Sequence, residues 1–155
     1  MAGTIEARLL QLKIELPTAS APAANYVPYV RTGSLLVMAG QICVWNGERR
    51  FIGKLGREFG VEQGQEAARI CGLNLLAQAK AALAGDLDRI VRCVRLGGFV
   101  NSTPDFLEQP RVVNGASDLM VEVLGDAGRH ARTAVGTNVL PFDVAVEVDA
   151  IFEVR

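Results

Sequence analysis

Apolar residues recur at helical spacing in three stretches of this chain and form short runs between them. Helices are predicted over residues 5–14, over residues 61–84, and from about residue 101 to residue 124 with a restart at Pro110. Strands are predicted over residues 26–31, 35–39, 42–45, 49–52 and 90–100, and in two closing segments joined at Leu140 and Pro141. Helices gathered on one face of a mixed sheet predict a single α+β domain.

Turn and linker signals separate these elements. Thr4 is a suitable cap for the first helix and Pro17 ends it, and the small residues of 17–25 indicate an extended linker. We therefore divide the chain into an N-terminal helical arm, residues 1–20, and a domain, residues 21–155. Asn46-Gly47 predicts a hairpin, because both central residues of a type I′ turn need positive φ.

The composition favours a subunit of an assembly over an isolated domain. With 155 residues the chain is long enough for one domain. Half of its residues are hydrophobic and only 21% are charged, which is slightly apolar for a lone soluble domain. If both helices cover the same sheet face, the other face needs a cover, and packing of identical subunits is a common solution.

Charge and hydropathy exclude several kinds of partner. The formal net charge is -1 and no basic run is longer than Arg49-Arg50, so composition offers no cationic face for nucleic acid. No apolar stretch is long enough to span a membrane. The first 20 residues include Glu6, Arg8 and Lys13, which a secretory signal would not carry. We expect a cytoplasmic protein with neither nucleic-acid nor membrane partners.

The cysteines and the histidine offer no metal site. Cys43, Cys71 and Cys93 are scattered, form no CxxC pair, and share the chain with a single histidine, His130. Such a set does not match a zinc site, and we expect three buried, reduced thiols.

The closing quarter of the chain carries the strongest chemical signal. Arg132 stands at the entrance of the first closing strand and Glu147 lies inside the second. A guanidinium can hold a carboxylate through two parallel hydrogen bonds. A carboxylate facing it across the turn would orient a water or hold the arginine in place.

These residues also form a signature that resembles the YjgF/RidA family. The closing motif stands here as Ala131-Arg132-Thr133-Ala134-Val135, Leu140-Pro141 and Val146-Glu147-Val148-Asp149. Earlier matches in the family's order are Pro28-Tyr29-Val30, Ala39-Gly40-Gln41-Ile42, Asn74 and Val113-Asn114. The resemblance runs from about residue 22 to the C-terminus.

The resemblance implies a fold, an assembly and an activity. The fold would be chorismate-mutase-like, with two main helices on one face of a mixed sheet, and the assembly a homotrimer with clefts between neighbouring subunits. The founding activity of the family is hydrolysis of enamine or imine intermediates, such as 2-aminoacrylate, to 2-keto acids and ammonia. That reaction needs neither metal nor organic cofactor, because an iminium carbon is already electrophilic.

Two substitutions and two longer segments set the chain apart from the deaminase group. Ala134 stands where many active members have Cys, and Ala39 where they have Ser. The N-terminal arm and the segment 114–132 are longer, which indicates a divergent branch.

The candidate catalytic residues are Arg132 and Glu147, and each has a second interpretation. Arg132 is a clamp for a substrate carboxylate, or a surface or interface ion pair. Glu147 positions water or acts as a general base, or it only orients Arg132, whose charge would lower its pKa.

The candidate substrate-binding residues add Tyr29, Asn114, Gly40, Ala134 and His130 to Arg132. Tyr29 closes the cleft or is a half-polar buried aromatic, and Asn114 points into the cleft or begins a helix. Gly40 lets backbone N–H groups approach a ligand, or it marks a β-bulge. Backbone groups around Ala134 would help to place water.

His130 is an acid–base group specific to this branch or a solvated loop residue. Ser117 and Asp118 lie at the mouth of the cleft or on the helix surface. Two functional hypotheses follow. The first is an enamine/imine deaminase-like hydrolase acting on a small carboxylate-bearing metabolite. The second is a trimer of the same family that binds a keto acid or a similar anion without turnover.

Overall fold

The computed structural model describes residues 3–21 and 24–155 of the chain. Elements follow one another in the order α1 (Thr4–Gln11), β1 (Tyr29–Thr32), β2 (Leu35–Ile42), β3 (Val44–Trp45), β4 (Glu48–Arg49), α2 (Val61–Ala82), η1 (Leu87–Arg89), β5 (Ile90–Asn101), α3 (Gln109–Leu124), η2 (Gly125–Gly128), β6 (Ala131–Thr137), η3 (Pro141–Asp143) and β7 (Val146–Val154).

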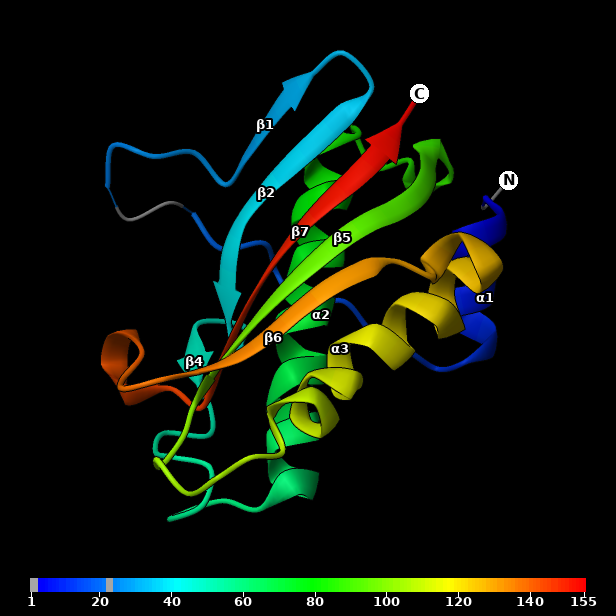
Figure 1. Ribbon diagram of the computed structural model, residues 1–155. Helices are drawn as coiled ribbons and strands as arrows, with labels where there is room; N and C mark the ends of the chain where they lie inside the picture. Colours follow the sequence, from blue (N-terminus) through cyan, green and yellow to red (C-terminus); the bar gives the residue numbers. More distant parts are fainter. Residues whose placement is uncertain (1–2, 22–23) are drawn as a thin grey trace.

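Five strands form a mixed sheet in the order β1-β2-β7-β5-β6. Every neighbouring pair is antiparallel except β5 and β6, which are parallel and connected through α3. The helices α2 and α3 lie side by side against one face of this sheet (Figure 1). The α+β class and the placement of both main helices on one face, predicted from the sequence, are confirmed.

Strand β7 shows how the two faces differ. Val146, Val148, Ala150, Phe152 and Val154 are buried toward the helices, and the residues between them are only partly buried. No helix of the described residues covers the second face, which exposes apolar side chains at several strands. The exposed fractions are 54% for Val30, 39% for Val37 and 42% for Val135. We call this side of the sheet the open face.

Close packing brings α3 against β5 at Gly98. A Cβ atom at this position would lie 2.5 Å from Cγ2 of Val113 in α3. Glycine therefore lets the helix approach the strand more closely than any other residue would allow. This approach sets the distance between α3 and the neighbouring edge strand β6, where Arg132 lies.

The N-terminal helix is tied to the domain by one carboxylate. Asp88 in η1 accepts hydrogen bonds from the backbone nitrogens of Thr4 at 2.7 Å and Ile5 at 2.8 Å. These bonds satisfy two of the backbone donors that a helix start leaves free, and they hold the pKa of the Asp88 carboxyl below its ordinary value. Leu9 of the same helix is buried in the common core.

Several predicted boundaries were wrong. Strand β1 begins at Tyr29 instead of residue 26, and Gly40 and Gln41 do not end a strand, because β2 continues to Ile42 with a bulge between Met38 and Gln41. The return strand of the hairpin is Glu48–Arg49 only. The hairpin turn itself is confirmed, with φ of 49° at Asn46 and 87° at Gly47.

The second main helix starts at Gln109, so the predicted start near residue 101 was also wrong. Asn101 belongs to β5, and Ser102 and Thr103 pair with Leu55 through a β-bridge and a 3.0 Å hydrogen bond. These tertiary contacts hold the segment extended in spite of its helix-start signal. None of the helices within residues 3–21 and 24–155 has the length and apolar composition that crossing a bilayer requires.

Candidate functional site

Arg132 lies at the edge of the sheet and points toward α3. It occupies the second position of β6, where its register partner in β5 is the buried Leu96. Paired residues on neighbouring strands share a face, so Arg132 leaves the sheet on the helix side. There its Nη1 donates to Asn114 Oδ1 at 2.8 Å and to Ser117 Oγ at 3.1 Å, and its Nη2 donates to the carbonyl of Pro110 at 3.2 Å.

This arrangement leaves one edge of the guanidinium available. Arginine has five N–H donors, and three of them are used by α3. Within the described part of the chain, the Nε–H and one Nη2–H group have no acceptor. Two such donors side by side match the two oxygens of a carboxylate. Arg132 is partly buried, so a bound anion would be shielded from water on one side.

Glu147 lies on the opposite face of the sheet from Arg132. It follows the buried Val146 in β7, and its register partners are Ile42 of β2 and Phe99 of β5. Strand β5 also separates β7 from β6. The expectation that this carboxylate faces Arg132 across the turn between the closing strands was therefore wrong for a single chain. The two strands are not neighbours, and alternation sends the two side chains to different sides.

The Glu147 carboxylate fills the space that Gly40 leaves free. A Cβ atom on Gly40 would lie 2.3 Å from Glu147 Oε1, so a larger residue there would displace the carboxylate. Burial raises the pKa of Glu147, and the nearby Asp149 raises it further. No Lys, Arg or His nitrogen of the described residues lies within 4.0 Å of the Glu147 oxygens.

Asp149 itself pairs with Arg95 on the open face. Arg95 Nη1 lies 3.2 Å from Asp149 Oδ1, and Nη2 donates to Thr133 Oγ1 at 3.3 Å. Both side chains of the ion pair are more than one-third exposed, so the pair contributes little to stability by itself. The open face thus combines apolar side chains with the Arg95–Asp149 ion pair and with the carboxylates of Glu147 and Glu153, which form no ion pair with the described residues.

The predicted site residues fall into two groups. Asn114 and His130 lie with Arg132 on the helix side, where Ser117 Oγ is 2.9 Å from His130 Nε2. Gly40 lies with Glu147 on the open face. Tyr29 and Ala134 are partly buried and pack against the core. Ala134 faces the helices, because it pairs with Gly98.

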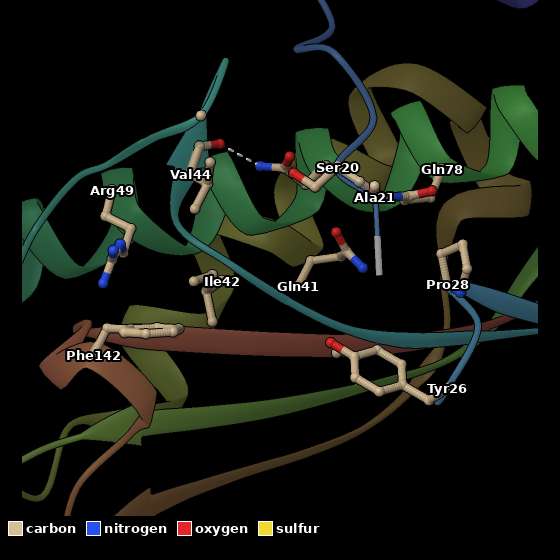
Figure 2. A pocket seen from close by; sticks show the side chains of 13 residues that line it. Ser20, Ala21, Tyr26, Pro28, Gln41, Ile42, Val44, Arg49, Gln78 and Phe142 are labelled. Carbon is tan, nitrogen blue, oxygen red and sulfur yellow. Dashed lines mark hydrogen bonds between the residues drawn. The ribbon is translucent and has the colours of Figure 1, made fainter. Parts of the chain in front are cut away.

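A cavity of about 420 Å³ opens beside the bulge of β2, and Gly40 lines it. Figure 2 shows Gln41 in its middle, with Tyr26 at one end and Arg49 and Phe142 at the other. The Arg49 guanidinium carbon lies 4.0 Å from the centre of the Phe142 ring, a cation–π contact. Gln78, almost fully buried in α2, donates to the Ser20 carbonyl at 2.6 Å on the far wall.

Sequence reasoning missed Arg49, Gln41, Gln78 and Phe142 as members of a cavity, because they come together only through the fold. For Ser117 the sequence offered the mouth of the cleft or the helix surface, and it did not predict the contact with Arg132. A signal existed for Ser117, since it lies three residues after Asn114 and so shares a helix face with it. In the described residues, Arg132 and Glu147 line none of the principal cavities.

The three cysteines lie outside these groups. Cys43, Cys71 and Cys93 are free and buried, as the sequence predicted. Burial raises the pKa of Cys93 to about 12 and that of Cys71 well above its ordinary value. Among residues 3–21 and 24–155, no three His, Cys, Asp or Glu side chains are grouped so that they could hold a metal ion.

Comparisons with known proteins extend over almost the whole chain. A family model described as "YjgF/chorismate_mutase-like, putative endoribonuclease" matches residues 6–154. Protein TCP17 of Trypanosoma cruzi is 51% identical over 155 residues, covering 99% of this chain and 96% of TCP17. The crystal structure of Atu1372 from Agrobacterium tumefaciens, a protein of unknown function, is similar with 50% identity and a TM-score of 0.91, covering 97% of this chain and 92% of that one.

A more distant similar structure was solved with a bound ligand. Escherichia coli TdcF with bound serine is 25% identical to this chain, with a TM-score of 0.59. The similarity covers 90% of this chain and 93% of that one.

Proposed function

This chain belongs to the YjgF/chorismate-mutase-like family, and from that premise we propose that it is an enamine/imine deaminase-like hydrolase. Its substrate would be a small carboxylate-bearing metabolite of the 2-aminoacrylate type, and its products a 2-keto acid and ammonia. The family resemblance found in the closing motifs is confirmed, and the activity is the part proposed here.

The observation that carries the proposal is the open edge of Arg132. Three hydrogen bonds to α3 fix the guanidinium, and two donors are left together for a planar anion. A carboxylate held in this way would have both oxygens paired and its reacting carbon in a constant position. The serine bound to TdcF supports a carboxylate-bearing ligand, because serine carries a carboxylate.

The separation of Arg132 and Glu147 favours a site shared between subunits. A site that uses both side chains needs a second copy of the chain, because they lie on opposite faces of one sheet. A homotrimer would bring the edge at β6 and α3 of one subunit to the open face of the next. It would also cover the apolar side chains at Val30, Val37 and Val135.

In the proposed reaction, the enamine first takes up a proton at its terminal carbon and becomes an iminium ion. Water then attacks the iminium carbon, so that a carbon–oxygen bond forms while the π electrons of the C=N bond go to nitrogen, and the base takes a proton from this water and passes it to the nitrogen. The carbon–nitrogen bond then breaks, ammonia leaves, and the hydroxyl group loses its proton as the C=O bond of the 2-keto acid forms. Glu147 is suited to this role, because burial and Asp149 raise its pKa toward the working range of a general base. Backbone groups around Ala134 would hold the water.

Turnover of 2-aminoacrylate generated in situ tests the proposal. An enzyme that eliminates water from serine supplies the intermediate, and ammonia release is measured above the uncatalysed rate. We expect acceleration by the wild type and none by Arg132→Ala. Arg111→Ala, which removes an exposed arginine from α3, the helix that Arg132 contacts, is the matched control and should retain the wild-type rate. No acceleration by the wild type would contradict the proposal.

The presence of Ala134 on the helix side of β6 favours a second candidate, a trimer that binds a keto acid without turnover. Its methyl group offers no thiol where many active relatives have Cys. In that case pyruvate binds to the wild type, binding is lost in Arg132→Ala, and ammonia release stays at the uncatalysed rate.

A further inference from the structure

A continuous chain of hydrogen bonds connects the loop before β6 to the Arg132 guanidinium. His130 Nδ1 lies 2.6 Å from the carbonyl oxygen of Gly128, and its Nε2 lies 2.9 Å from Ser117 Oγ. Ser117 Oγ lies 3.1 Å from Arg132 Nη1. His130 lies between η2 and β6, Ser117 in α3 and Arg132 in β6, so the contact of Ser117 with the other two depends on the fold.

Donor and acceptor chemistry fixes the direction of this chain. A carbonyl oxygen only accepts, so the hydrogen of the neutral imidazole lies on Nδ1 and points to Gly128. The other nitrogen, Nε2, is then an acceptor. Arginine only donates, so Ser117 Oγ accepts from Arg132 and has its own hydrogen left for His130. Every donor and acceptor in the chain has a partner of the right kind.

The same chain determines which guanidinium edge meets a ligand. Ser117 Oγ and Asn114 Oδ1 take both hydrogens of Nη1, and the Pro110 carbonyl takes one of Nη2. Only the edge formed by Nε and Nη2 then remains for an anion. A bonded serine keeps Arg132 in this orientation, whereas a serine free to rotate would not.

We propose that Ser117 and His130 are positioning residues, which orient Arg132 so that its Nε–Nη2 edge receives the substrate carboxylate. The inference rests on the proposed function above for the identity of the ligand, and on the hydrogen bonds for the orientation. It also gives His130 a role that differs from both interpretations of the sequence. The histidine acts through Ser117 on the clamp, and is neither an acid–base group nor a solvated loop residue.

Binding of pyruvate to four variants and one control variant of the full chain tests the inference. Ser117→Ala removes one acceptor of Nη1 and should weaken pyruvate binding about tenfold, the size expected for one hydrogen bond to a charged group. Ser117→Thr keeps the hydroxyl and should bind as the wild type does. His130→Gln keeps an acceptor for the serine hydroxyl and should lose less affinity than His130→Ala. Asp118→Asn, an exposed neighbour on α3, is the matched control for Ser117.

Nitrogen-15 NMR supplies a measurement that does not depend on the ligand. We expect the neutral His130 ring to carry its hydrogen on Nδ1, and the Arg132 Nε–H signal to shift in Ser117→Ala but not in Ser117→Thr. If the wild type gave these NMR results and yet neither bound pyruvate nor accelerated ammonia release, that outcome would contradict the proposed function and would still support the proposed orientation of Arg132. A hydrogen on Nε2, or an unchanged Arg132 signal and pyruvate affinity in Ser117→Ala, would overturn the inference and leave the proposed function standing.

Discussion

Arg132 and Glu147 leave the same sheet on opposite faces. Arg132 pairs with Leu96 of β5, which is buried on the helix side of the sheet. Glu147 pairs with Phe99 of the same strand, which faces the open side. Two residues that stand in one closing motif are therefore separated by the thickness of the sheet in a single chain. A reaction that needs both must take them from two subunits.

A mixing experiment follows from this separation. Arg132→Ala and Glu147→Gln should each be inactive alone in the 2-aminoacrylate assay. When the two variants are co-expressed with different tags and the mixed trimers isolated, they should recover about one third of the wild-type activity, because in each mixed trimer one of the three shared sites combines an intact Arg132 with an intact Glu147.

The expected recovery depends on where each residue acts. If Arg132 and Glu147 served the same site from one chain, every site in the mixed oligomer would lack one of them. Mixed oligomers without activity, prepared from variants whose melting temperatures equal that of the wild type, would therefore contradict a shared site.

Replacement of Gly40 tests the role of the Glu147 carboxylate without removing it. The Cβ atom of Gly40→Ala would lie 2.3 Å from Glu147 Oε1 and would push the carboxylate aside. We expect turnover to fall about a hundredfold, the size of effect that a displacement of about 1 Å produces in a catalytic group. Gly60→Ala is the control, since its Cβ would meet its nearest neighbour at 3.4 Å. Full activity of Gly40→Ala would exclude Glu147 from the reaction.

The pH dependence of stability should report Glu147 directly. Burial raises the pKa of its carboxyl, so the contribution of this group to stability is present below the ordinary glutamate pKa of about 4.3 and is lost as pH rises through the folded-state value. Glu147→Gln removes that loss. At about pH 7 the variant should melt about 2 °C above the wild type, and the difference should vanish near pH 4. A variant that melts lower at neutral pH would indicate that the assembly supplies Glu147 with a cation.

The attachment of the N-terminal helix depends on Asp88. The hydrogen bonds from Thr4 and Ile5 lower the pKa of this carboxyl, so its contribution is present above the ordinary Asp pKa and is lost as pH falls through the folded-state value. Asp88→Ala should cost about 1 kcal/mol of unfolding free energy and lower the melting temperature by about 2–4 °C. It should also make the first 20 residues more sensitive to protease. Asp126→Ala, which removes a fully exposed carboxylate, should change neither measurement.

Local signals predicted the elements of the fold well where neighbouring residues decide the structure. The Asn46-Gly47 turn depends on the φ angles of those two residues alone, and both are positive in the structure. The helix α2 was predicted to within two residues at its end, because its apolar stripe is long. The helix signal near Asn101 was overridden by pairing with Leu55, which lies far away in the sequence.

The site was predictable by residue type and not by geometry. Apolar and polar residues alternate along β7, which places Glu147 on the other face from Val146 and Val148, whereas the sequence of β6 shows no such alternation to indicate which face Arg132 takes. The insertion of β5 between the two closing strands is a long-range property. The hydrogen bond between Ser117 and His130 likewise needs α3 and the end of η2 to be placed by the whole domain.

A crystal structure of the protein soaked with pyruvate tests the central claim most directly. We predict that the pyruvate carboxylate accepts hydrogen bonds from Nε and Nη2 of Arg132, with Nη1 still bonded to Asn114 and Ser117. Pyruvate bound instead at Arg49 in the cavity beside Gly40, with the Nε–Nη2 edge of Arg132 occupied by a neighbouring protein group, would contradict it.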